Sequence, residues 1–180
     1  MVSPLSGLVV NVAEVLRRVG NVKDIATEVD ADLLAFEDGR IGRQEIPVEF
    51  HLESTNTGIV VNGRVSAGFH DRCKRCLRDV DARITVPIAE LYQREPTDPD
   101  AYPLTGEQLD LAPLVREHVL LALPDAPLCR PDCPGLCPVC GADKSDPAEA
   151  NCGCATTTVD PRWAALEGLR GAVPDDTSGG

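Results

Sequence analysis

Aromatic side chains, methionine and positive charge are all scarce in this chain of 180 residues. With one Trp, two Tyr, three Phe and one Met, aliphatic side chains must fill the core. The 17 Lys and Arg residues are outnumbered by 29 Asp and Glu residues, which gives a formal net charge of −12. That balance argues against a general nucleic-acid binder that relies on bulk positive charge.

Long hydrophobic runs are missing as well. The apolar residues 8–12 are too few for the hydrophobic core of a signal peptide, and no stretch approaches the ~20 apolar residues of a membrane span. We therefore expect a cytoplasmic protein. Thiols stay reduced in that compartment, so clustered cysteines there more often bind metal than form disulfides.

Cysteine is absent outside two clusters, a first pair at Cys73 and Cys76 and six residues between positions 129 and 154. Four thiolates at tetrahedral corners hold a structural zinc ion, and a C-x2-C spacing can place two sulfurs on one ion. Gly141, after the second C-x2-C, suits the positive φ that such turns often need. We predict two structural Zn2+ ions with these ligands: Cys73, Cys76, Cys129, Cys133, Cys137, Cys140, Cys152 and Cys154.

The segment 129–138 cannot order itself without such ions. Pro131, Pro134 and Pro138 exclude a helix, and the segment has no apolar core. Ordering the backbone costs roughly 1–2 kcal/mol per residue. Structural zinc can offset this cost, because its binding contributes about 10–16 kcal/mol in small peptides.

Two partitions of the eight ligands are open. The first makes a local site of the four cysteines after residue 136 and joins Cys129 and Cys133 to the first pair. The second combines the two C-x2-C pairs as a zinc ribbon. The first is favoured because closing nearer partners costs less loop entropy. Iron also accepts four thiolates. Neither complete site would leave an open position for a catalytic water, and we see no nucleophile–base pair, so we expect no enzymatic activity.

Alternating apolar residues predict a small antiparallel sheet in residues 1–94. Residues 46–53 and 80–88 alternate with period two, which indicates two strands with one buried face each. Residues 59–69 predict a further strand, in which Asn62-Gly63 could form a tight hairpin turn. We also expect a short strand at 8–10, a helix at 13–18 capped by Asn11, and an extended segment at 23–30.

The second half is expected to begin with a linker, since residues 95–106 are rich in Pro, Asp and Thr. Residues 107–170 would then hold a helix from about 111 to 122 capped by Asp110, the Cys-rich region, and a short C-terminal helix anchored by Trp163. Residues 171–180 predict a disordered tail. The fold class is thus α+β: an antiparallel β-sheet with a few helices and a Cys-rich zinc-binding loop region.

The pattern of these motifs resembles the YceD family, the large ribosomal RNA subunit accumulation proteins of bacteria and plastids. It is carried by residues 73–77 (CKRCL), 109–117 (LDLAPLVRE), 123–141 (LPDAPLCRPDCPGLCPVCG) and 160–166 (DPRWAAL). The extended cysteine set is similar to that of the high-GC Gram-positive branch. Some relatives keep only a reduced set near Cys73, Cys76, Cys129 and Cys133, which supports the first partition.

The resemblance implies a ribosome biogenesis factor that promotes accumulation and maturation of 23S ribosomal RNA and assembly of the large (50S) subunit. Its implied partners are a pre-50S particle, 23S rRNA or a ribosomal protein, with no membrane and no small-molecule substrate. The family supplies no enzymatic activity to carry over.

Local charge reverses around the first cysteine pair, where Asp71 and Asp79 only partly offset four basic side chains. We hypothesise that these four residues contact RNA phosphates: Arg72, Lys74, Arg75 and Arg78. Alternatively, they are solvated side chains attracted by the thiolates. A zinc-stabilised interaction module that shields a basic ribosomal protein is the competing function. His118 is expected to be packed or half-exposed and not a ligand, because cysteines complete both sites.

Overall fold

The computed structural model describes residues 8–96, 101–154, 162–163 and 166. Two compact units divide the chain, residues 1–129 and residues 130–180. The named strands and helices of the described residues all lie in the first unit. None of the described helices is long and apolar enough to cross a membrane.

Five strands form the main sheet of the described residues, in the order β2-β3-β4-β5-β6, and β1 pairs separately with β7. Neighbours from β2 to β5 are antiparallel, whereas β6 runs parallel to the end of β5. The sheet is therefore mixed but mostly antiparallel, in rough agreement with the predicted class. The strands are β1 (Val9–Asn11), β2 (Val22–Asp30), β3 (Glu45–Ser54), β4 (Gly58–Arg72), β5 (Asp79–Gln93), β6 (Tyr102–Pro103) and β7 (Gln108–Asp110).

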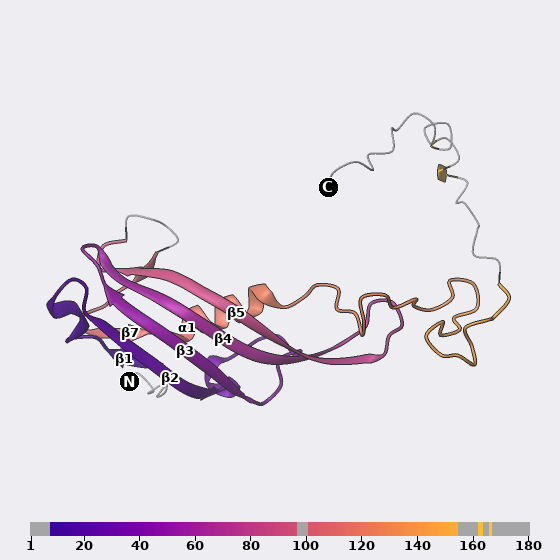
Figure 1. Cartoon of the computed structure of the whole chain (residues 1–180), viewed down its shortest axis with the longest axis horizontal. Helices are drawn as coiled ribbons and strands as arrows, with labels where there is room; N and C mark the ends of the chain where they lie inside the picture. Colours follow the sequence, from indigo (N-terminus) through magenta and orange to yellow (C-terminus); the bar gives the residue numbers. More distant parts are fainter. Residues whose placement is uncertain (1–7, 97–100, 155–161, 164–165, 167–180) are drawn as a thin grey trace. The chain divides into compact units, whose positions relative to one another are not determined.

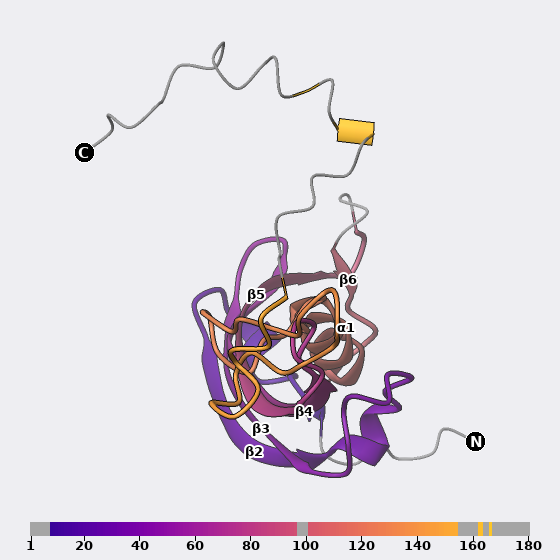
Figure 2. The same ribbon diagram turned by 90° about the vertical axis from the view of Figure 1, so that its right-hand side faces the viewer.

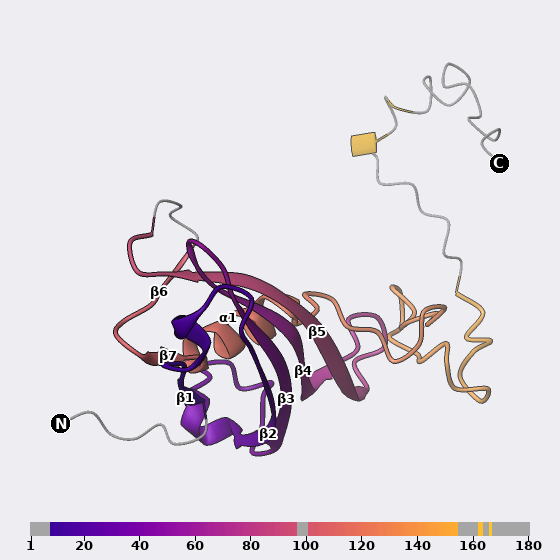
Figure 3. The same cartoon turned by 60° about the vertical axis from the view of Figure 1, so that its left-hand side comes forward.

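The core lies between one face of this sheet and α1 (Ala112–Ala122), the one α-helix of the described residues. Strands β2 to β5 curve around the helix (Figures 2 and 3). The predicted period-two pattern of β3 is confirmed, because every second side chain points into the core. The buried apolar side chains of β3 and α1 are Ile46, Val48, Phe50, Leu52, Ala112, Leu114, Val115 and Val119.

The start of α1 follows its sequence signals in part, since the N-cap is Leu111, one residue after the predicted Asp110. The backbone N–H of Ala112 donates to Asp110 Oδ1 at 3.0 Å, and Pro113 lies in the first turn, where its missing N–H costs little. The chain leaves the helix at Leu123, which is extended, because the following Pro124 disfavours a helical conformation there.

The prediction of a hairpin turn at Asn62-Gly63 was wrong, since β4 runs without a break from Gly58 to Arg72. Gly63 pairs with Phe50 on one side and Ile88 on the other. A Cβ at Gly63 would collide with the carbonyl oxygen of Glu49 and the Phe50 ring. Glycine is needed here for close strand packing.

Of the predicted N-terminal elements, the helix is shorter than expected. Asn11 Oδ1 accepts from the N–H of Ala13 at 3.0 Å, but the predicted helix is reduced to the single 3-10 turn η1 (Val15–Arg17). The extended segment is confirmed as β2. A second 3-10 turn, η2 (Ala31–Leu34), was not predicted.

The linker proposed for residues 95–106 stays a prediction. Part of it forms β6, and Leu104 is buried in the core. The tail at 171–180 lies outside the described residues, as does most of the proposed C-terminal helix.

Replacing Gly63 tests the packing explanation. We expect Gly63→Ala to lower the free energy of unfolding by about 1–3 kcal/mol, as overpacked core positions do. The neighbouring exposed Asn62→Ala should change it by less than about 0.5 kcal/mol. Urea denaturation of both variants measures the difference, and equal stabilities would contradict the close-packing role.

Candidate metal centres

The β4–β5 hairpin carries the first cysteine pair at its tip. β3 pairs with β4 only as far as Val48 and Val65, whereas β4 and β5 stay paired to Arg72 and Asp79. Two strands therefore continue past the end of β3 (Figure 1). The turn between them, residues 73–78, is called the first knuckle.

Two backbone hydrogen bonds close the first knuckle. The N–H of Cys73 donates to Arg78 O at 2.8 Å, and the N–H of Leu77 donates to Cys73 O at 2.9 Å. A third bond, from the N–H of Lys74 to Pro127 O at 3.0 Å, holds the chain before Cys129 beside the knuckle. Cys76 Sγ and Cys129 Sγ are 3.6 Å apart.

The second knuckle, residues 137–142, repeats this geometry. The N–H of Cys137 donates to Ala142 O at 2.8 Å, and the N–H of Gly141 donates to Cys137 O at 2.9 Å. Gly141 has a φ of 78°, which confirms the prediction from its position. Leu77 takes the equivalent position in the first knuckle with a φ of 63°, a conformation that costs a residue with a Cβ roughly 1–2 kcal/mol.

The eight sulfurs gather into two groups, and within each group all sulfurs lie within 4.8 Å of one another. The groups are those of the first partition and not of the zinc ribbon. Cys73, Cys133 and Cys137 are almost fully buried. The members are Cys73, Cys76, Cys129 and Cys133 in the first group, and Cys137, Cys140, Cys152 and Cys154 in the second.

Three thiols have shifted pKa values. Burial raises the pKa of Cys73, but backbone N–H groups of Cys129, Cys76 and Arg75 outweigh it and lower the value to about 6. Donation from the N–H groups of Cys140 and Val139 lowers the pKa of Cys137 to about 6. Hydrogen bonds with the side chains of Cys140 and Cys152 raise the pKa of Cys154 to about 12.

This donor set fits a soft divalent cation. Thiolates packed this closely repel one another, and each knuckle supplies N–H groups that stabilise negative sulfur. Four thiolates suit tetrahedral zinc and also iron. Either group could thus hold a metal ion, and a filled four-sulfur set has a structural character.

The basic side chains of the first knuckle and of the adjacent Arg72 are partly neutralised. Arg72 Nε lies 3.8 Å from Asp79 Oδ1, and Lys74 Nζ lies 3.2 Å from Asp71 Oδ1. Arg75 and Arg78 are both exposed. Their contact with RNA stays a prediction.

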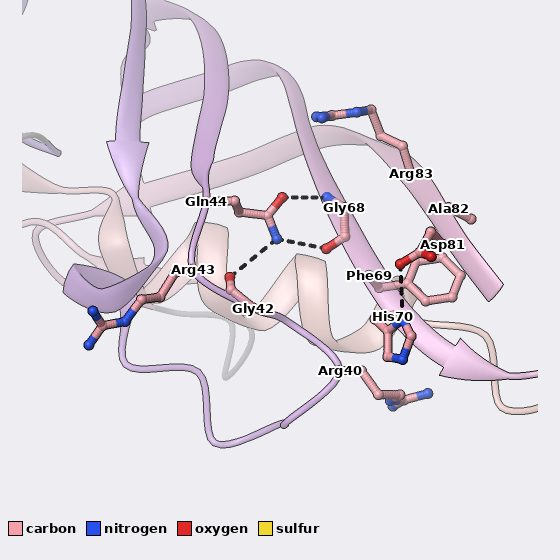
Figure 4. A pocket seen from close by; sticks show the side chains of 10 residues that line it. All are labelled: Arg40, Gly42, Arg43, Gln44, Gly68, Phe69, His70, Asp81, Ala82 and Arg83. Atoms are coloured by element: carbon pink, nitrogen blue, oxygen red, sulfur yellow. Dashed lines mark hydrogen bonds and ion pairs between the residues drawn. The ribbon is translucent and has the colours of Figure 1, made fainter. Parts of the chain in front are cut away.

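A groove of about 480 Å³ beside β4 was missed from the sequence (Figure 4). The Gln44 amide donates to Gly68 O at 2.8 Å and accepts from the N–H of Gly68 at 2.7 Å, so it pairs with β4 just before β3 begins at Glu45. Figure 4 shows the side chains of Arg40, Arg43 and Arg83 at three separate places. They do not converge on one ligand. No local sequence signal indicates this contact, because the pairing residues are 24 positions apart.

The histidines pair with carboxylates. His118 is half-buried, as expected, with Nε2 3.0 Å from Glu90 Oε1. His51 Nδ1 lies 2.6 Å from Asp24 Oδ1 on the outer face of the sheet. Trp163 is 58% exposed, and most of the helix it was expected to anchor lies outside the described residues.

Comparison with known proteins gives a family and uncharacterised relatives. A family model described as "Large ribosomal RNA subunit accumulation protein YceD" matches residues 61–170. "Uncharacterized protein Rv2926c" of Mycobacterium tuberculosis is 32% identical over 187 residues, covering 97% of this chain and 86% of the relative. "Uncharacterized protein ML1660" of Mycobacterium leprae is 29% identical over 178 residues, covering 90% and 77%. No solved structure matches the chain.

Pairs of cysteine substitutions test the grouping of the sulfurs. We expect two zinc ions per chain by native mass spectrometry, one for each group. Cys76→Ser with Cys129→Ser removes two ligands of the same group, so one ion should remain. Cys76→Ser with Cys140→Ser damages both groups, so both ions should be lost. The zinc-ribbon arrangement predicts the opposite pair of results.

Acid should release metal only after the thiolates are protonated. The pKa values of Cys73 and Cys137 are lowered to about 6, from about 8.5 in unfolded chains. The contribution of these two thiolates to the stability of the metal-free protein is therefore present above about 8.5 and is lost as pH falls through about 6. A bound ion keeps its ligands deprotonated to a lower pH than in the metal-free protein, so a zinc-sensitive dye should detect release only below about pH 6. Release already complete at pH 7 would contradict these shifts.

Proposed function

This chain belongs to the YceD family of large ribosomal RNA subunit accumulation proteins, and from that premise we propose that it is a non-enzymatic ribosome biogenesis factor. It promotes accumulation and maturation of 23S rRNA and assembly of the 50S subunit in the cytoplasm. The observation that carries the proposal is the family match, which extends over both knuckles and α1.

Structural zinc is part of the proposal. The donor atoms are eight sulfurs in two tetrahedron-sized groups, and complete four-thiolate sites have no position for a catalytic water. Zinc would supply the folding free energy that the Pro-rich segment lacks. This supports a scaffold function in preference to catalysis.

The first knuckle is the proposed RNA contact, through Arg72, Lys74, Arg75 and Arg78. These four positive charges and the two carboxylates Asp71 and Asp79 leave a local charge of +2. A divalent ion with four thiolates carries a formal −2, so the knuckle as a whole is close to neutral. The contact would therefore be short and geometrically defined, with few phosphates and weak intrinsic affinity.

The other face of the first unit favours a second candidate function, the shielding of a basic ribosomal protein. The outward side chains of β2 and β3 are predominantly acidic and exposed. Such a face repels phosphate and attracts Lys and Arg side chains. The partner would then be a polypeptide, and the two functions are compatible within one assembly factor.

Charge reversal tests the RNA contact. Changing Arg72, Lys74, Arg75 and Arg78 to Glu should abolish co-sedimentation with 50S precursors, while the four-residue control at Arg17, Arg18, Arg94 and Arg116 should retain it. Binding should weaken with salt with a logarithmic slope of about −3, as four phosphate contacts to single-stranded RNA require. Metal content checks that the knuckle is intact.

Crosslinking in cells separates the two candidates. A covalent adduct of the first knuckle with 23S rRNA supports the RNA contact. Adducts confined to a polypeptide, together with normal co-sedimentation of the charge-reversed variant, would refute it and favour the shielding function.

A further inference from the structure

Strand β2 forms one edge of the main sheet. It pairs with β3 over its full length, and no other described strand pairs with its second side. An unpaired edge offers a row of N–H and C=O groups to another extended chain. Edges of this kind bind peptides by strand addition, in which main-chain hydrogen bonds supply affinity and alternate side chains supply specificity.

The register shows which groups face the open edge. The N–H of Ala31 donates to Gln44 O, and the N–H of Ser54 donates to Asn21 O, both at 2.9 Å. Hydrogen-bonded pairs alternate along an antiparallel ladder. The odd-numbered residues of β2 therefore bond with β3, and Asp24, Ala26 and Glu28 direct their backbone groups outward.

Side chains beside this edge select the charge of the occupant. Asp24, Glu28 and Asp30 are exposed on the outer face. The register places three glutamates of β3 next to them on that face: Glu45, Glu49 and Glu53. Two of the six carboxylates contact a basic side chain: Glu49 Oε2 lies 2.6 Å from Arg64 Nη2, and Asp24 Oδ1 lies 2.6 Å from His51 Nδ1.

The core-side face of β2 determines which side chains of an added strand would alternate with its basic ones. Ile25 is half-buried and Val29 is buried, and both lie on the core side in register with Phe50 and Ile46. The exposed Lys23 and Thr27 alternate with them on the same face. An added strand lies about 4.8 Å from β2 with its side chains on alternating faces. Its inward side chains would pack beside Ile25 and Val29, and its outward side chains would meet carboxylates.

We propose that the β2 edge binds an extended basic segment of a partner protein by strand addition, with Lys or Arg alternating with aliphatic residues. Only the identification of that partner with a ribosomal protein rests on the proposed function. RNA is disfavoured because its phosphates would face the carboxylates. A second copy is disfavoured because antiparallel pairing about Ala26 would bring Asp24 opposite Glu28, and like charges directly opposite are destabilising.

A synthetic peptide tests the edge without any ribosomal component. The probe is a labelled nine-residue peptide of alternating Lys and Val, titrated with the full metal-loaded chain by fluorescence anisotropy. The same peptide N-methylated at alternate residues keeps its charge but cannot pair with the strand, and it should bind at least about tenfold more weakly, a loss equal to one or two hydrogen bonds. A Glu-Val peptide should not bind.

Protein variants separate backbone pairing from charge. Ala26→Pro removes an outward N–H that β3 does not use, and Ala26→Val keeps it; we expect about tenfold weaker binding for the proline variant alone. Asp24→Lys with Glu28→Lys should abolish binding. The matched control, Glu95→Lys with Glu107→Lys, changes net charge equally at exposed sites away from the edge and should retain most of the affinity.

Hydrogen exchange completes the test. The amides of Asp24, Ala26 and Glu28 should exchange rapidly in the protein alone and become protected with the Lys-Val peptide. Protection in the protein alone would mean that residues 1–7 or a second copy occupy the edge, and would overturn the proposal. Equal binding of the N-methylated and unmodified peptides would also overturn it. Failure here leaves co-sedimentation with 50S precursors unaffected, so the two proposals fail separately.

Discussion

Repulsion among closely packed thiolates is the constraint on which the Cys-rich segments of this structure depend. Four sulfurs lie within 4.8 Å of one another in each group, and two unit charges at that separation repel by several kcal/mol even at an effective dielectric constant of about 20. Neighbouring N–H groups lower the pKa of Cys73 and Cys137 to about 6, which favours the charged form. A divalent cation converts this repulsion into attraction, and the segments that carry the sulfurs have little else to order them.

The sheet has the opposite character, since it is held by aliphatic packing around α1 and needs no ion. The sheet supports the β4–β5 hairpin, which carries the first cysteine pair. The two strands of this hairpin stay paired beyond the last pair between β3 and β4. In the part of β4 that has no partner in β3, the Gln44 amide forms two hydrogen bonds with the backbone of Gly68. A polar side chain thus continues the ladder where backbone pairing stops. The result is a knuckle held at a defined place in the first unit without a core of its own.

Local patterns in the sequence predicted much of this arrangement. Alternation predicted β3, the Asp110 and Pro113 signals predicted α1, and cysteine spacing with loop-closure entropy predicted how the sulfurs group. The failures involve residues whose environment is set across strands. Asn62-Gly63 has the local pattern of a turn, but Gly63 is required by Glu49 and Phe50 on the adjacent strand. The contact of Gln44 with Gly68 and the left-handed backbone of Leu77 likewise have no local signal.

The two groups of cysteines are completed at different times during synthesis, because their members are separated by different lengths of chain. Cys76 and Cys129 are 53 residues apart, and a ribosome adding about 5–20 residues per second needs several seconds to bridge them. Cys73 and Cys76 therefore lack their two partner cysteines until α1 has been synthesised. During that time the two thiols are open to oxidation or to binding another metal ion. The second group spans a short loop and can be completed almost as soon as it emerges. Metal binding by the second group would be a nearly local event, whereas metal binding by the first group would require that the sheet and α1 have already been synthesised.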